Sequence, residues 1–365
     1  MNLDIFKDKE IVNKALLSLK NKVKKFNNIR LMEFCGTHTH NIFQFGFRNV
    51  FLPHIKFIAG PGCPVCVTSE EDLAEIKFLF DNYNIGIIAY GDLLKVPLKG
   101  KSLLDFRAEG KPVEVVYSAI DAIKVAENKK DKEWAFLGVG FETTAPATSA
   151  SIMIAQKKGI KNLSFLSFHK NTKAILKALA TLEKIYADGV ILPGHVSAVV
   201  GYNYFRDIEK FGLPAVVMGF EPLDIIAGIN ELVDMIEKGE KGIKCAYPRA
   251  VSDKGNPKML KAIEDVFYTK SAYWRGLGLI EDGGFEIKDV YDEYNARKRY
   301  KIPEQISITK DSGCKCGDVL IGKIEPLDCP LFKKVCTPVN PIGPCMVSYE
   351  GTCLAYYKYG EFVNS

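Results

Sequence analysis

The chain lacks several features that mark common classes of protein. No run of 18 apolar residues occurs and the N-terminus is charged from Asp4 onward, so neither a membrane-spanning helix nor a secretory signal is indicated. No basic block is interleaved with aromatic residues, which leaves nucleic-acid binding unsupported. Residues 60–62 lack the third glycine of a dinucleotide-binding fingerprint, and residues 100–102 lack the upstream glycine of a P-loop. We therefore expect a soluble, cytoplasmic protein that binds neither nucleic acid nor membrane.

The chain does contain ten cysteines, in an otherwise ordinary composition of 25% charged and 47% hydrophobic residues with a formal net charge of +5. Its 365 residues are enough for two or three hydrophobic cores without covalent crosslinks. Because the cytosol keeps thiols reduced, the cysteines are better explained by metal binding or redox chemistry than by a disulfide scaffold.

Short apolar runs alternate with helical patterns along most of the chain. Apolar runs of this kind are strands covered on both faces, as in parallel sheets with helical crossovers. The runs are residues 29–34, 55–59, 85–90, 113–117, 134–139, 163–168, 190–192 and 215–218.

This pattern predicts an α/β fold with two Rossmann-like parallel-sheet domains, over residues 29–128 and 132–245, joined near residue 130. The alternation of apolar runs with helical patterns stops in residues 246–365, although 256–267 and 288–297 have helical patterns. We expect this segment, completed by an amphipathic N-terminal helix over residues 4–27, to form a smaller iron–sulfur lobe.

Ligands of parallel sheets lie beyond the carboxyl ends of the strands, and the loops there hold most of the unusual residues. The first such loop is CGTHTH (residues 35–40) and the second is GPGCPVC (residues 60–66). Asp92, Glu142 and Glu221 also lie at strand ends, where they can act in acid/base chemistry or equally well cap helices.

Cys63 and Cys66 form a CxxC pair just before TSEE (residues 68–71), a sequence typical of a capped helix start. A helix N-terminus favours a thiolate, and this spacing can close a disulfide, which predicts a redox-active dithiol. Half of a zinc knuckle is the alternative. Cys35 with His38 three residues later is a nucleophile beside a base, a metal ligand with a neighbouring imidazole, or a buried inert thiol.

The tail holds six cysteines among prolines. Four well-separated thiols, Cys329, Cys336, Cys345 and Cys353, have a spacing too open for a zinc ribbon and favour an iron–sulfur cube. Cys314 and Cys316 are then alternate ligands, a shielded pair or redox partners. Cys245 has no motif and is expected in the core.

Six blocks, in this order, resemble the HypD family of [NiFe]-hydrogenase maturation proteins over nearly the whole chain. They are MEFCGTHT (32–39), GPGCPVCVT (60–68), GVGFETTAP (138–146), PGHVS (193–197), PVNPIGPCMVS (338–348) and EGTC (350–353). The resemblance implies a maturase rather than a conventional turnover enzyme. With the small chaperone HypC, it would hold iron while the Fe(CN)2CO unit is assembled, with cyanide arriving from a thiocarbamate on HypE.

By the same resemblance, Cys35 would bind the iron with His38 as its neighbour, and Cys63 and Cys66 would be the redox-active dithiol. A [4Fe-4S] cluster, in a setting similar to ferredoxin:thioredoxin reductase, would be held by Cys329, Cys336, Cys345 and Cys353. Iron carrying diatomic ligands needs soft thiolates, electrons and shielding from water, which these three sets of cysteines can supply.

We therefore expect Cys35 and the Cys63/Cys66 pair to face one cleft between the α/β halves, with the cluster nearby, because sulfur chemistry needs near contact. Two other functions remain open. One is an iron–sulfur protein-disulfide oxidoreductase, which leaves Cys35 and His38 without a role. The other is a colourless, non-enzymatic zinc scaffold.

Overall fold

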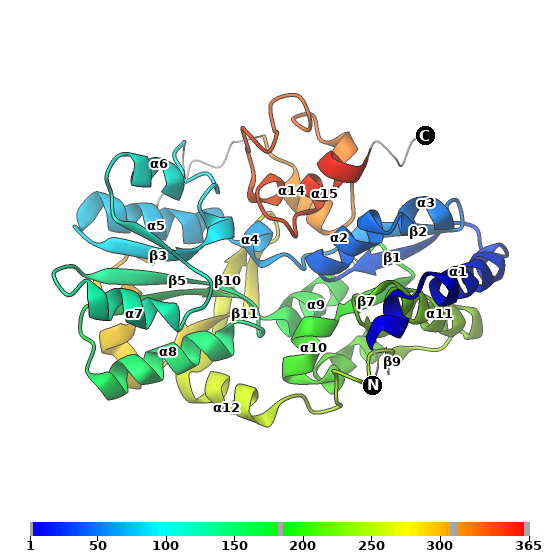
Figure 1. The fold of residues 1–365 in the computed structure, drawn as a ribbon, viewed down its shortest axis with the longest axis horizontal. Coiled ribbons are helices and arrows are strands. Elements are labelled where there is room, and N and C mark those ends of the chain that lie inside the picture. The colour runs from blue at the N-terminus through cyan, green and yellow to red at the C-terminus, as the bar shows by residue number, and fades with distance from the viewer. Residues whose placement is uncertain (1–2, 99, 182–184, 305, 307–312, 361–365) are drawn as a thin grey trace.

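Two parallel sheets, lying side by side, dominate the fold, and a small lobe sits over their junction (Figure 1). The computed structural model describes residues 3–98, 100–181, 185–304, 306 and 313–360. No helix in this described part of the chain has the length and apolar character of a membrane span.

The first sheet has five parallel strands in the order β2-β1-β7-β8-β9. They are β1 (Ile29–Glu33), β2 (Ile55–Ala59), β7 (Gly189–Pro193), β8 (Pro214–Met218) and β9 (Gly242–Cys245). Successive side chains of a strand point to opposite faces, and both faces are buried: Leu31 belongs to one apolar cluster and Met32 to another. The helices of this domain are α1 (Lys9–Val23), α2 (Gly36–Gln44), α3 (Phe47–Phe51), α9 (Thr172–Thr181), α10 (Gly194–Val200), α11 (Pro222–Lys238) and the 3-10 segment η3 (Tyr202–Phe211).

The second sheet has four parallel strands in the order β4-β3-β5-β6. They are β3 (Gly86–Tyr90), β4 (Val113–Val116), β5 (Trp134–Gly140) and β6 (Leu163–His169). Around them lie α5 (Glu70–Asn82), α6 (Leu103–Ala108), α7 (Asp121–Asn128), α8 (Ala145–Lys158), α12 (Pro257–Val266) and α13 (Ala296–Arg299). An antiparallel hairpin, β10 (Phe267–Trp274) and β11 (Gly278–Ile287), packs its buried residues into the same core.

All eight predicted strands are present and parallel, so the α/β fold with two Rossmann-like sheets is confirmed. Their grouping into consecutive sets of four is wrong. The chain leaves the first sheet after β2, builds the whole second sheet, and returns as β7, so the boundaries 29–128 and 132–245 cut across both sheets. An apolar run indicates that a strand is buried, but it does not indicate which strand pairs with it. The sequence pattern therefore did not predict that the chain crosses between the two sheets.

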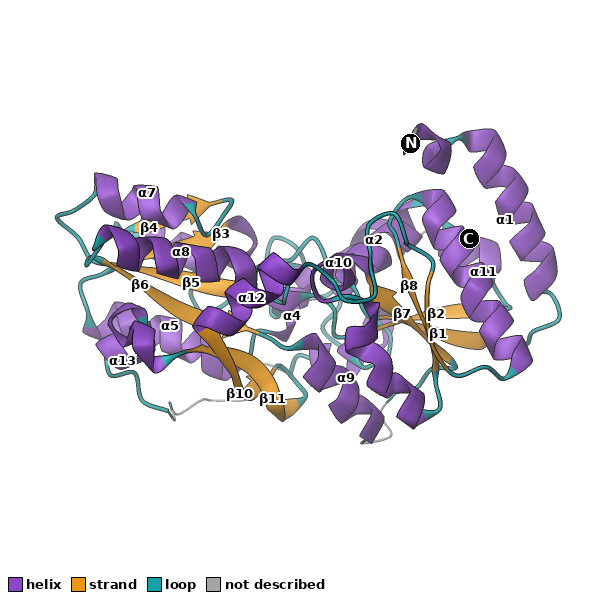
Figure 2. Cartoon of the chain, turned by 90° about the horizontal axis from the view of Figure 1, so that it is seen from below, coloured by secondary structure: helices purple, strands orange, loops and turns teal. Residues whose placement is uncertain are grey.

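The N-terminal helix does not complete the lobe as expected. Helix α1 lies along α11 (Figure 2), and its Leu19 and Val23 are buried in the core of the first sheet domain. Likewise, residues 257–300 pack with the second sheet, where α12 confirms one predicted helix and the hairpin occupies a stretch for which the pattern indicated no strand. Of the expected third domain, residues 305, 307–312 and 361–365 lie outside the described residues.

The lobe is therefore smaller than predicted and covers residues 313–360. It contains α14 (Cys316–Leu320), α15 (Thr352–Tyr359) and the short 3-10 segments η5 (Pro326–Asp328) and η6 (Pro344–Met346). Phe332, Met346, Leu354 and Tyr356 form a small apolar cluster together with Phe43 of α2. The lobe thus docks on the first sheet domain through α2.

A buried ion pair supports this docking. Arg48 of α3 donates from Nη2 to both carboxylate oxygens of Glu33, at 2.7 and 2.6 Å, and both residues are buried. The guanidinium also lies 4.3 Å from the ring centre of Phe43 and 5.5 Å from that of Tyr356. One side chain therefore connects β1, α2 and the lobe.

We predict that Arg48→Met destabilises the protein by about 3–5 kcal/mol, because it leaves the buried Glu33 carboxylate without its ionic partner. Denaturant unfolding monitored by circular dichroism measures this change. The control is Lys14→Met, which removes an exposed pair with Glu10 and should cost about 0.5 kcal/mol or less. Equal effects of the two variants would show that the buried pair contributes no more than a surface pair.

Candidate thiol and metal centre

The contact that forms the centre follows from the pairing of β1 with β2, which are parallel neighbours whose carboxyl ends lie together. The Gly36 amide donates to the carbonyl of Gly62 at 3.2 Å. A Cβ at Gly62 would lie 2.5 Å from the Cα of Cys35, so only glycine fits there. Since neighbouring Cα atoms are about 3.8 Å apart, the Cα atoms of Cys35 and Cys63 lie within about 8 Å of each other.

The two thiol sites therefore meet, but they are covered rather than exposed in an open cleft. Cys35 is 6% exposed, Cys63 2% and Cys66 0%. The cover is the lobe: a Cβ at Gly36 would lie 2.5 Å from Glu350, and the Thr37 hydroxyl donates to Glu350 Oε1 at 2.8 Å. The sequence pattern could not predict that this lobe buries the two thiol sites.

Cys63 and Cys66 form a disulfide, with their Cα atoms 5.2 Å apart. Cys63 is the N-cap of the short helix α4 (Pro64–Val67) and Cys66 lies within it, and the Cys66 amide donates to Cys63 Sγ at 3.1 Å. The predicted helix start follows directly, because Ser69 caps α5 in a reciprocal capping box with Asp72. A disulfide is the arrangement expected of the dithiol alternative rather than of a zinc knuckle.

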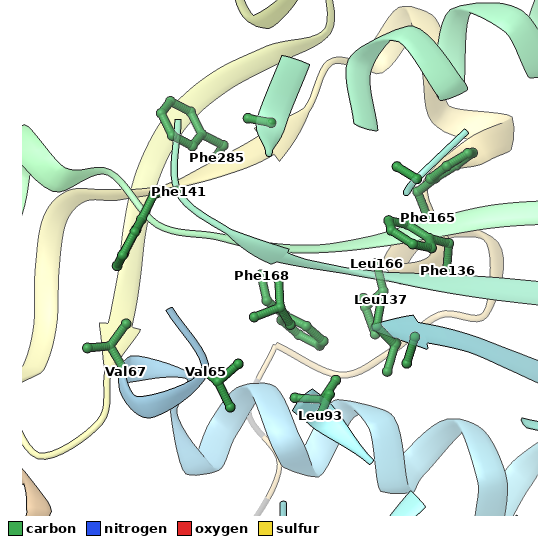
Figure 3. Packing of buried hydrophobic residues seen from close by; sticks show 14 of the residues in the cluster. Val65, Val67, Leu93, Phe136, Leu137, Phe141, Phe165, Leu166, Phe168 and Phe285 are labelled. Atoms are coloured by element: carbon green, nitrogen blue, oxygen red, sulfur yellow. The ribbon is translucent and has the colours of Figure 1, made fainter. Parts of the chain in front are cut away.

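Helix α4 is anchored in the core of the second sheet. Val65 and Val67 lie among Leu93, Phe141 and Phe168 (Figure 3), all of them buried. Since the loop before α4 leaves β2 of the first sheet, the disulfide lies where the chain passes from one sheet domain to the other.

The surroundings of Cys35 favour a neutral thiol in the metal-free protein. Burial raises the pKa of Cys35 to about 12, and the charge of Glu350 adds to this effect. Burial also raises the pKa of Glu350 itself. A metal ion bound at Cys35 would therefore have to displace its proton.

His38 is a buried, neutral imidazole. Its Nε2 lies 3.0 Å from the carbonyl of Gly219, so this nitrogen carries the hydrogen and Nδ1 is an acceptor. Among the described residues Nδ1 has no hydrogen-bond partner. The ring stacks on Phe220, which stacks in turn on His195, and burial lowers the pKa of His38 to about 4.

The lobe brings all six of its cysteines near one another. A Cβ on Gly343 would lie 2.7 Å from Cys314 Sγ and 4.0 Å from Cys316 Sγ, and the Cys353 amide donates to Cys345 Sγ at 3.2 Å. Contact with Cys345 raises the pKa of Cys353, and Cys316 and Cys314 raise it further. Burial raises the pKa of Cys336, and the nearby Cys314 and Cys329 raise it further.

These six thiols suit an iron–sulfur cluster in their chemistry, since four thiolates are its usual ligands. Within the described ranges, no three histidine, cysteine or acidic side chains are drawn around a single metal-ion position. Cys314 and Cys316, set apart in the sequence, thus belong to the same group as Cys329, Cys336, Cys345 and Cys353. Cys245 lies half-buried at the end of β9, in contact with the core.

Comparison with known proteins fits this arrangement. Residues 10–360 match the family model of HypD, described as the hydrogenase formation hypA family. The chain belongs to the HypD family. This confirms the resemblance drawn from the six sequence blocks.

Curated relatives match over almost their whole length. A hydrogenase expression/formation protein of Methanocaldococcus jannaschii is 38% identical over 353 residues, 96% of this chain and 98% of its own. The hydrogenase maturation factors HypD of Azotobacter vinelandii and Cupriavidus necator are 37% and 35% identical, covering 98% and 99% of this chain and 97% of their own lengths.

The acids at the strand ends serve the fold. Glu142 accepts hydrogen bonds from the Thr172 amide and hydroxyl, both at 2.9 Å, at the start of α9, and Glu221 caps α11. Asp92 accepts from the Ser348 hydroxyl of the lobe at 3.4 Å. The acid beside Cys35 is instead Glu350, which belongs to the EGTC block but lies too far along the sequence to be connected with Cys35 before the fold is known.

Glu142 makes the stability of the protein depend on pH. Burial raises its pKa to about 7, from 4.5 for a free side chain. The unfolded chain therefore loses this proton first, so the free energy of unfolding should fall by up to about 3 kcal/mol as the pH rises from 4.5 to 8. We predict that Glu142→Gln flattens this decline, as measured by urea unfolding at a series of pH values.

The matched control is Glu10→Gln on the exposed face of α1. For this variant, the plot of unfolding free energy against pH should run parallel to that of the wild type. If the Glu142→Gln curve is parallel as well, the buried carboxyl does not titrate in this range.

Proposed function

We propose that this chain is a [NiFe]-hydrogenase maturation factor that holds iron at Cys35 while the Fe(CN)2CO unit is assembled. A HypC-type chaperone would share the iron, and a HypE-type protein would donate the cyanide. The observation that carries the proposal is the contact between the Cys35 loop and Gly62, which brings a buried single thiol next to a dithiol.

The residues around Cys35 suit the handling of iron as a substrate. Bound iron displaces the Cys35 proton, because the thiolate is the form that coordinates metal. His38 offers a neutral imidazole whose Nδ1 is free to accept a proton or a hydrogen bond. The lobe keeps water away through Glu350 and Thr37, which protects cyanide and carbon monoxide ligands during assembly.

The other cysteines supply reducing power. Cys63 and Cys66 alternate between the disulfide and the dithiol, two electrons apart. Cys329, Cys336, Cys345 and Cys353 would hold a [4Fe-4S] cluster, which would supply low-potential electrons, with Cys314 and Cys316 beside it.

An iron–sulfur protein-disulfide oxidoreductase is the second candidate, and the Cys63–Cys66 disulfide is the observation in its favour. Such an enzyme must present a sulfur to a large substrate, whereas these two cysteines are 2% and 0% exposed. It also gives Cys35 and His38 no task. Both features favour the maturase.

We predict that Cys35→Ala abolishes the retention of iron carrying diatomic ligands, because it removes the ligating thiolate. The protein is purified without oxygen together with its HypC-type partner, and infrared spectroscopy detects the cyanide and carbon monoxide stretching bands. The matched control is Cys245→Ala, a cysteine remote from the motifs, which should keep the bands.

Bands that persist in Cys35→Ala would contradict the assignment of the iron to Cys35. Reduction of protein disulfides by the same preparation tests the second candidate. That activity, if present in the wild type and unchanged in Cys35→Ala while no diatomic bands occur in either, would favour the oxidoreductase.

A further inference from the structure

The turn between β10 and β11 reaches from the second sheet domain to the dithiol loop. Arg275, the first residue of this turn, is 6% exposed. Its amide donates to the Val67 carbonyl at 3.0 Å and its Nε donates to the Thr68 carbonyl at 2.9 Å. The backbone immediately after Cys66 is therefore held at two points by one residue.

The same turn touches the cysteine lobe. Gly276 has a φ of +70°, and a Cβ there would lie 2.3 Å from the Cα of Gly317, the residue after Cys316. The two backbones approach so closely because neither residue has a side chain. The turn thus lies directly between the dithiol loop and the segment that carries Cys314 and Cys316, and the charge of Arg275 is felt by both of these cysteines.

The charge of Arg275 is only partly neutralised. Its Nη1 pairs with Glu70 in the first turn of α5, but the Glu70 side chain is 39% exposed and that of Arg275 is 7% exposed. Water screens an exposed charge more strongly than a buried one. The buried guanidinium therefore leaves a positive potential beside the dithiol loop.

We propose that Arg275 is a positioning residue for the thiol chemistry: it fixes the dithiol loop against the cysteine lobe and makes reduction of the Cys63–Cys66 disulfide more favourable. This inference rests on the proposed function, in which the disulfide is reduced and reformed. Reduction breaks the sulfur–sulfur bond, takes up two electrons and leaves two thiols, or a thiol and a thiolate when only one proton is gained. The two-thiol product has gained as many protons as electrons and carries no charge, whereas the thiolate of the one-proton product is negative. A nearby positive charge therefore favours reduction through the thiolate form.

The test is the redox equilibrium of the disulfide in the full chain. Oxidised and reduced dithiothreitol serve as the buffer: the reduced reagent supplies both electrons and protons and itself closes to a cyclic disulfide. The reduced fraction of Cys63 and Cys66 is read by alkylation and mass spectrometry of their peptide, so the measurement is independent of bound iron.

We expect Arg275→Gln to lower the equilibrium constant for reduction about tenfold, which corresponds to about 30 mV for a two-electron couple. Arg275→Lys keeps the charge and should lie closer to the wild type. Glu70→Gln removes the opposing charge and should shift the equilibrium the other way. A purely structural ion pair predicts the same direction for Arg275→Gln and Glu70→Gln, because each breaks the same contact.

Shifts in the same direction, or no shift in either variant, would overturn the inference. If Arg275→Gln fails to fold, as judged by circular dichroism, the opposite shift of Glu70→Gln and the near-wild-type value of Arg275→Lys decide the question. Persistence of the diatomic bands without Cys35 would refute the proposed function but leave these equilibria unchanged, so the two failures can be told apart.

Discussion

The close approach of two loop backbones, at Cys35 and at Gly62, is the constraint on which the rest of the structure depends. Parallel pairing of β1 with β2 brings both loops to the same edge of the sheet. Glycine at position 62 then lets the Cys35 backbone come within contact, because any side chain there would collide with it. The separation of Cys35 from the disulfide is therefore set by main-chain contacts, which vary far less than side-chain rotamers.

The lobe supplies what the sheets alone do not, namely burial. It docks through Phe43 and the guanidinium of Arg48, and through the hydrogen bond between Thr37 and Glu350. Because it closes over Cys35, burial raises the pKa of this thiol, so a metal ion bound there would have to displace its proton. The same six-cysteine lobe is thus both the cover of the proposed iron site and the proposed source of its electrons.

Local patterns predicted the strands and the loops that carry the chemistry, since apolar runs and turn residues act within a few positions. They did not predict which strands pair, so the crossing between the two sheets was missed. Some contacts join segments that lie hundreds of positions apart in the sequence. They are the hydrogen bonds from Arg275 to the carbonyls of Val67 and Thr68, and the approach of Glu350 to Gly36. The spacing of residues in a single sequence does not indicate which distant segments contact each other. The hairpin β10–β11 was missed for another reason: five of the eight residues of β10 are polar or exposed, unlike a buried strand.

The crossing between the sheets explains why the dithiol is where it is. The chain leaves β2 in one domain, passes Cys63 and Cys66, and enters α5 in the other, so the disulfide lies in the connection itself. On one side of this connection Gly62 touches Cys35, and on the other side Arg275 binds the carbonyls of Val67 and Thr68. With both ends held, opening of the disulfide has little freedom to relax into solvent. The reduced sulfurs therefore stay beside Cys35 and beside the lobe, whose η6 contacts α4. These are the two places where the proposed function needs them to act.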